Sequence, residues 1–144
     1  MGDMSTVFEM IIAREIPGTF VWEDEKCVGI MTIEPIAPGH ALVIPREPIS
    51  KWTDLSPDLL SHVALTAQKI GAAQEVAFGV PRATLIIAGF EVPHTHLHVV
   101  PARSESDVQL SHARADDPAN IAEAAKRLRV ALRGAGYGEF VPEG

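Results

Sequence analysis

The sequence predicts an α+β fold, built from a mainly antiparallel β-sheet and separate helices. The first reason is that the short β-type runs of the first half are joined by connections of hairpin length, which favour antiparallel pairing. The second is that two longer segments repeat apolar residues at helical spacing. The third is size, because 144 residues, 47% of them hydrophobic, suit a single domain over residues 1–144 with a buried core.

The first half of the chain is expected to form a short helix followed by three strands. The helix is predicted over residues 6–14, and the Pro17-Gly18 turn ends it. Runs typical of strands cover residues 19–23, 27–33 and 40–45, separated by polar or proline-containing turns. The last run, HALVIP, is mostly apolar and is therefore predicted to lie near the centre of the sheet.

The second half contains the two longer helices and two further strands. Ser56 is a suitable N-cap for a helix that continues to a stop at Gly79. Strands are predicted over residues 82–88 and 95–101. A C-terminal helix over 118–133 completes the chain, with basic residues toward its end, as the helix dipole favours.

Composition and charge argue against several classes of function. The 12 Lys and Arg against 19 Asp and Glu give a formal net charge of −7, so no nucleic acid polymer is expected as a partner. No apolar run approaches the roughly 18 residues of a membrane span, so no membrane partner is expected. The single cysteine, Cys27, can form no intramolecular disulfide, which favours a reducing, cytoplasmic setting. Met1-Gly2 with Thr6 matches the loose N-myristoylation pattern, although an ordinary N-terminus explains these residues as well.

Three of the six histidines, His94, His96 and His98, alternate with other residues and form what we call the triad. In a strand, residues two apart point to the same face, so neighbouring rings of the triad would lie about 6.6–7 Å apart. Packing three imidazoles side by side is unfavourable unless their nitrogens are paired. The pattern therefore indicates a binding or catalytic site.

Two kinds of site fit this row of imidazoles. Alternate imidazoles can hold a divalent metal, but the outer two rings lie about 13–14 Å apart in a straight strand. An ion would therefore need a bent strand or ligands from elsewhere, such as His40 or Glu91. In the second kind, the row brackets a phosphate: one neutral imidazole attacks phosphorus and its neighbours donate hydrogen bonds to the oxygens. The spacing favours the phosphate.

The triad also resembles a known signature. The motif HTHLHVV, a His-x-His-x-His followed by two apolar residues, is similar to that of the histidine-triad (HIT) superfamily of nucleotide hydrolases and transferases. The resemblance covers about residues 6–101 and includes the E-I-P turn and the stretch PIAPGHALVIP. It implies a HIT-like fold, a five-stranded antiparallel sheet with two main helices, to which this chain adds the C-terminal helix. It also implies a homodimer joined into one continuous sheet.

The resemblance assigns roles to individual residues. His96 matches the nucleophile that forms a covalent nucleotidyl-histidine intermediate on the α-phosphate. His94 and His98 match flanking residues that hydrogen-bond the phosphate and orient the nucleophile, and His40 matches the family's fourth, earlier histidine. The apolar base pocket of the family falls on four positions, each of which alone is also typical of a core: Phe8, Ile11, Ile30 and Ile33.

The sequence departs from the family's pattern beside the triad. Phe90 replaces a glutamine and Glu91 replaces a hydroxyl residue, both of which ordinarily contact phosphate. Because a carboxylate repels a phosphate, Glu91 is expected either to act as a protonated general acid for the leaving group or to face off the site. Thr32 stands where an acidic or amide residue commonly contacts the ribose. Thr6 and Glu9 stand where some bacterial relatives have Cys-x-x-Cys, so that structural zinc site is not expected.

We therefore expect a nucleotide-phosphate hydrolase or nucleotidyl transferase acting on nucleoside phosphoramidates or dinucleoside polyphosphates, with a purine as the family's usual base. No cofactor or protein-bound metal is expected, although a polyphosphate substrate can carry Mg²⁺. Two other classes stay open: a nucleotide-binding module with weak or no catalysis, suggested by Phe90 and Glu91, and, less favoured, a metal-binding protein. His62 on the long helix and His112 in the loop before the last helix are expected to be incidental.

Overall fold

The computed structural model describes residues 5–143, so the Met1-Gly2 pair of the myristoylation pattern lies outside the described residues. Eight helices and strands carry the fold within this range, together with short 3-10 turns. In chain order they are α1 (Val7–Ile12), β1 (Phe20–Glu23), β2 (Cys27–Met31), β3 (Ala41–Pro45), α2 (Pro57–Phe78), β4 (Arg82–Ile86), β5 (Leu97–Ala102) and α3 (Pro118–Gly134).

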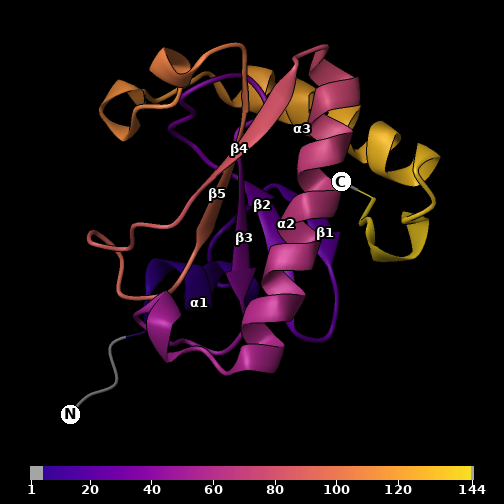
Figure 1. Cartoon of the computed structure of the whole chain (residues 1–144). Helices are drawn as coiled ribbons and strands as arrows, with labels where there is room; N and C mark the ends of the chain where they lie inside the picture. The colour runs from indigo at the N-terminus through magenta and orange to yellow at the C-terminus, as the bar shows by residue number, and fades with distance from the viewer. Residues whose placement is uncertain (1–4, 144) are drawn as a thin grey trace.

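The five strands form one antiparallel sheet in the order β1-β2-β3-β5-β4, which confirms the predicted fold class. Strand β3 lies at its centre, as its apolar sequence predicts. Helix α2 runs along one face of the sheet and packs on β3, β4 and β5, while α3 packs on α2 and reaches β1 (Figure 1). The central pairing of β3 with β5 therefore joins the segment around His40 to the triad.

Helix α2 begins and ends at the predicted residues. The Ser56 hydroxyl accepts the backbone N–H of Leu59 at 3.1 Å, and Gly79 closes the helix in the left-handed region at φ 62°. Glycine reaches this conformation without the steric cost of a Cβ atom. Neither α2 nor any other helix within residues 5–143 has both the length and the apolar character needed to cross a bilayer.

Alternation along the strands divides the core between the two faces of the sheet. Side chains such as Val21, Val43 and Leu97 pack beneath α2 and α3. The opposite face, which we call the α1 face, carries a second cluster formed by Phe8, Phe20, Val28, Ile30, Leu42 and Ile44. Full burial of one such side chain stabilises the fold by about 1.5–3 kcal/mol. The short helix α1 and the loop that contains Val92 pack on this second face, and a cavity lies beside them.

Several strand ends differ from the sequence expectation. Strand β2 ends at Met31 instead of residue 33, β4 ends at Ile86 instead of residue 88, and β5 begins at Leu97 instead of residue 95. Thr95 stays outside the sheet because its N–H and its hydroxyl both donate to the carbonyl of Ile49, each at 2.8 Å. The prediction that the whole triad lies in one strand is therefore wrong, and only His98 belongs to β5.

Candidate active site

The pairing of β3 with β5 brings His40 and His98 together. Leu42 lies opposite His98 in the register, and His40 directly precedes β3. The Nε2 atom of His40 lies 3.0 Å from Nδ1 of His98, and the backbone N–H of Ile36 donates to Nδ1 of His40 at 3.0 Å. Two imidazoles that sequence places 58 residues apart therefore share one hydrogen bond.

These contacts determine the tautomers of both rings. A neutral imidazole has one N–H and one lone pair, so His40, which accepts from Ile36 at Nδ1, carries its proton on Nε2. It donates this proton to Nδ1 of His98, which leaves the proton of His98 on its own Nε2. The Nε2–H of His98 has no partner among the described residues. The His98 ring lines the cavity of the α1 face.

His96 has the opposite tautomer. Its Nδ1 lies 2.8 Å from the carbonyl oxygen of His94 and must donate, because a carbonyl only accepts. Its Nε2 is therefore unprotonated, and this atom has no partner among the described residues. The ring centroids of His96 and His98 lie 5.0 Å apart, so a lone pair and an N–H donor stand on neighbouring rings at one cavity.

His94 has a different position from the other two members of the triad. It is fully buried, its Nε2–H donates to the carbonyl of Pro45 at 2.7 Å, and its Nδ1 accepts from the hydroxyl of Thr6 at 2.9 Å. Both ring nitrogens are occupied, and the residue does not line the cavity. In this geometry His94 can orient His96 through its carbonyl but offers no free nitrogen to a phosphate.

Burial lowers the pKa of all four histidines. The pKa of His40 falls to about 3 and that of His98 to about 4, in each case first through burial and then through the charge of a neighbouring imidazole. The pKa of His94 and His96 is also lowered by burial, against the raising effect of the carbonyl that each ring contacts. All four rings are therefore neutral near pH 7, which is the state that an imidazole nucleophile requires.

The cavity of the α1 face has a volume of about 760 Å³ and is mainly apolar. It brings together nearly all of the predicted site, and of those residues only His94 does not line it. The predicted residues on its walls are Phe8, Ile11, Ile30, Thr32, Ile33, His40, Glu91, His96 and His98. Phe8 and Ile30 are buried and belong to the core and the cavity wall at once, whereas Ile33 is 75% exposed at the mouth. This volume falls in the range of about 300–1,000 Å³ typical of small-molecule sites.

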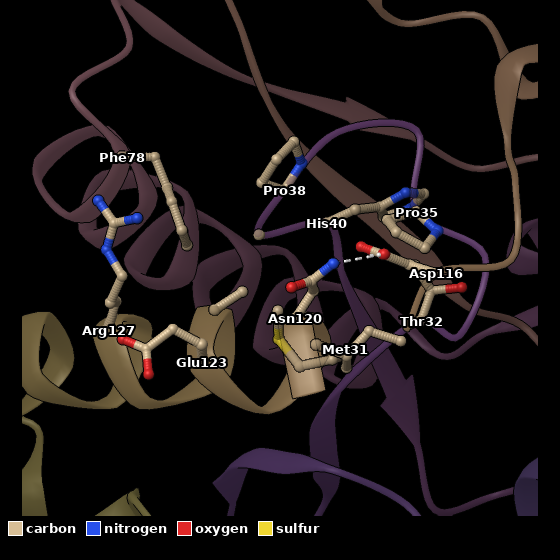
Figure 2. A pocket seen from close by; sticks show the side chains of 13 residues that line it. Met31, Thr32, Pro35, Pro38, His40, Phe78, Asp116, Asn120, Glu123 and Arg127 are labelled. Carbon is tan, nitrogen blue, oxygen red and sulfur yellow. Dashed lines mark hydrogen bonds between the residues drawn. The ribbon is translucent and has the colours of Figure 1, made fainter. Parts of the chain in front are cut away.

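A smaller cavity of about 250 Å³ touches His40 and Thr32 but neither His96 nor His98 (Figure 2). Figure 2 shows Asp116 and Asn120 on its wall, joined by a hydrogen bond of 3.0 Å. Arg127, also on this wall, is exposed and donates to the carbonyl of Ala77 at 2.7 Å. His96 and His98, whose unpaired ring nitrogens are the reactive ones, line the cavity of the α1 face and not this smaller one.

The structure adds residues that sequence reasoning missed. The Thr6 hydroxyl accepts the N–H of Glu9, whose side chain accepts the N–H of Thr6, and the same hydroxyl supports His94. The Thr-x-x-Glu spacing of this capping box is a readable signal for the helix start, though not for the contact with His94. The carbonyl of Pro45 and the N–H of Ile36 have no side-chain signal, because they are backbone groups.

The remaining histidines do not line the cavity of the α1 face. His62 donates to Asp24 at 2.8 Å, and the exposed His112 lies in a 3-10 turn next to Leu110, which does line it. Among the described residues, the triad is not a group whose donor atoms converge on one ion. The group that does converge, with donor atoms within 4.8 Å of one another, is Asp24, Cys27 and His62. None of these three lines the cavity of the α1 face, and Asp24 and His62 line a different cavity.

Comparison with known proteins decides the family, since the HIT domain profile matches residues 13–105. The chain belongs to the HIT family. A HIT-like protein of Synechococcus elongatus is 36% identical over 104 residues, which span 69% of this chain and 91% of that protein. The resemblance inferred from the HTHLHVV motif is thereby confirmed, and the chain belongs to a superfamily of nucleotide-binding hydrolases and transferases.

Solved HIT structures share the fold. A zinc-bound histidine triad family protein of Mycobacterium smegmatis superposes with a TM-score of 0.81 at 31% identity, covering 95% of this chain and 99% of that one. A HIT-like protein of Bartonella henselae gives 0.78 at 30% identity, covering 91% and 99%. A bifunctional bis(5'-adenosyl)-triphosphatase/adenylylsulfatase of Arabidopsis thaliana is 38% identical over 80 residues, which span 52% of this HIT chain and 44% of that protein.

Proposed function

We propose that this HIT chain is a nucleotidyl hydrolase or transferase that forms a covalent nucleotidyl-histidine on His96. The observation that carries the proposal is the tautomer of His96. Because the His94 carbonyl holds the Nδ1–H, an unprotonated Nε2 remains on the wall of a nucleotide-sized cavity. Nucleoside phosphoramidates and dinucleoside polyphosphates are the substrate classes proposed, with a purine base against the apolar wall that includes Phe8 and Ile30.

The reaction proceeds in two half-reactions. The lone pair of His96 Nε2 attacks the α-phosphorus, and the bond from phosphorus to the leaving nitrogen or oxygen breaks with its electron pair on the leaving group. Water then attacks phosphorus, the P–Nε2 bond breaks, and the electron pair returns to His96. Across both steps one water is consumed, with a hydrogen ending on the leaving group and a hydroxyl on phosphorus. In transfer, an alcohol or phosphate oxygen takes the place of water.

The His40–His98 pair stabilises the phosphate during both steps. His98 presents its Nε2–H, and His40 holds it in that tautomer by donating to Nδ1 at 3.0 Å. Preorganised N–H donors aimed at developing charge are among the largest contributions to catalysis, and loss of one costs about 100- to 1,000-fold in kcat. The charge of the imidazolium that forms at His96 is met by the His94 carbonyl at 2.8 Å.

Alkaline denaturation during turnover of adenosine monophosphate linked through a P–N bond to butylamine tests the proposal, because a P–N bond to histidine survives in base and hydrolyses in acid. Wild type should carry one adenylyl group on His96, located by peptide mass spectrometry, and His96→Ala should lose both the label and turnover. His112→Ala is the matched control, because His112 is exposed and does not line the cavity. Turnover without a labelled histidine, or full activity of His96→Ala, contradicts the mechanism.

A second candidate is a nucleotide-binding module with little catalysis. Phe90 and Glu91 favour it, because both line the cavity where the family's pattern has neutral phosphate donors, and Phe90 is 97% exposed. Nucleotide affinity without turnover over a panel of phosphoramidates and dinucleoside polyphosphates would support this candidate over the enzyme.

We also propose a homodimer through the β4 edge of the sheet. Of the two edge strands, β1 is covered by α3, where Arg129 Nε donates to the carbonyl of Phe20 at 2.9 Å. Strand β4 forms the other edge, and its Leu85 is 50% exposed. Analytical ultracentrifugation should give a dimer for wild type and a weakened dimer for Leu85→Lys, because a charge on an edge strand disfavours strand addition. A monomeric wild-type protein contradicts the proposal.

A further inference from the structure

We propose that the cavity selects a positively charged leaving group, so that the preferred substrate is a nucleoside phosphoramidate of a cationic amine. Glu91 and Phe90 are the specificity-determining residues. The inference rests on the proposed function of His96 and names the substrate class of the same site. It comes from the two positions at which the chain departs from the family's pattern.

The charge of the cavity wall is the first observation. Among the described residues that line the cavity there is no Lys or Arg, and the formally charged side chains are two carboxylates, Glu34 and Glu91. Both side chains are exposed to solvent. The four histidines add no positive charge near pH 7, since burial lowers the pKa of each. The wall beyond the reactive nitrogens is therefore negative.

This charge disfavours a polyphosphate leaving group. A dinucleoside polyphosphate brings several negative charges, which the carboxylates on the wall repel, most strongly at low salt. The single charge at the reacting phosphate is met by the N–H of His98, but no further donor from a basic side chain lines the cavity among the described residues. A leaving group that carries a positive charge has the opposite, favourable interaction with Glu34 and Glu91.

The chemistry of residues 90 and 91 is the second observation. Phe90 is 97% exposed, so both faces of its ring are free, and it lines the cavity beside Glu91. An aromatic face and a carboxylate are the two side-chain surfaces that attract an ammonium group, the first through its quadrupole and the second through its charge. Glu91 is close enough to His96 for its charge to raise the pKa of that ring against the larger effect of burial. The carboxylate and the reactive ring therefore share one cavity, and the charge of one acts on the other.

The ammonium group takes no part in making or breaking bonds. When His96 Nε2 attacks phosphorus, the P–N bond breaks, and the leaving nitrogen gains a proton and departs as an amine. The distal ammonium stays protonated throughout. The contact of the ammonium group with Glu91 is therefore expected to raise kcat/KM. This increase should become smaller as salt is added, because charges of an exposed pair are screened over about 10 Å at 0.1 M ionic strength.

Three matched substrates test the inference: adenosine monophosphate linked through a P–N bond to putrescine, to butylamine or to γ-aminobutyrate. They share the reacting bond and differ in the charge of the distal end, which is positive, neutral or negative. For wild type, kcat/KM should fall in that order, with a ratio of roughly fivefold between the first two, as expected for an exposed ion pair. In Glu91→Gln that ratio should move toward one, and in Glu91→Lys the order should reverse.

The control is Glu105→Gln, which removes an exposed carboxylate that does not line the cavity and should leave the ratio unchanged. Equal kcat/KM for the three substrates, or a ratio that Glu91→Gln does not change, overturns the inference while leaving the His96 mechanism intact. Faster turnover of a Mg²⁺-loaded dinucleoside polyphosphate than of the putrescine compound also overturns it. If no compound is turned over, the proposed catalysis fails, and the affinities of the same three compounds by calorimetry then decide the charge preference.

Discussion

The neutral state of His40 predicts a specific loss of stability in acid. His40 is 2% exposed, and burial holds its pKa near 3, whereas a histidine in the unfolded chain titrates near 6.5. Between these values the unfolded state binds a proton that the folded state does not, so lowering the pH favours unfolding. The contribution is present in full above pH 6.5 and changes by about 1.4 kcal/mol per pH unit below it. From pH 6.5 to pH 4.5 it therefore amounts to about 3 kcal/mol.

Urea denaturation of wild type and His40→Gln at several pH values measures this difference. The fluorescence of Trp22, which is buried and stacked on Phe140 at 4.8 Å, reports unfolding. The free energy of unfolding of wild type should fall by about 3 kcal/mol more than that of His40→Gln between pH 6.5 and 4.5, because glutamine does not titrate. His112→Gln, which replaces an exposed histidine, should follow wild type. If wild type and His40→Gln change in parallel, His40 is not held neutral by burial and the reasoning is refuted.

Two further substitutions test the support of the site. Thr6→Val removes the hydroxyl that donates to His94 and caps α1, and should lower the free energy of unfolding by about 1–3 kcal/mol. Thr6→Ser, which keeps a hydroxyl, should restore most of this stability. A Thr6→Val variant with the stability of wild type would contradict the assigned contact. Gly39→Ala should destabilise more than Gly79→Ala in the same urea assay, because at φ 94° its Cβ would lie 2.3 Å from the Phe78 ring, whereas Gly79 has no atom within 4 Å of an added Cβ. Equal losses would show that the ring moves away without cost.

The sequence was most informative where structure depends on neighbours along the chain. Ser56 caps α2 and Gly79 ends it because capping and left-handed turns are local events. The five antiparallel strands agree with the resemblance and the hairpin-length connections, and the central place of β3 agrees with its apolar sequence. The start of β5 was missed because Thr95 is held by Ile49, a residue 46 positions earlier, and no local pattern encodes that contact.

The candidate site divides in the same way. Alternation of histidines and the PGH segment were enough to select His40, His96 and His98, and all three line one cavity. The same reasoning gave His94 an equal role, whereas the structure buries it fully and occupies both of its nitrogens. Sequence pattern identifies residue types that suit a reaction, but it does not show which polar atoms are already paired within the fold.

By itself the sequence determined the fold class, the family and the residues that carry reactive nitrogens, because these depend on local propensity, apolar pattern and motif spacing. Only the tertiary structure decided which nitrogen of each ring bears the proton. That choice is made by Thr6 and Pro45 for His94 and by Ile36 for His40. The His94–Thr6 contact spans 88 residues of sequence and the His94–Pro45 contact 49. A tautomer is set by the donor or acceptor that a ring meets, and most of these partners meet the rings only when distant parts of the chain fold against one another.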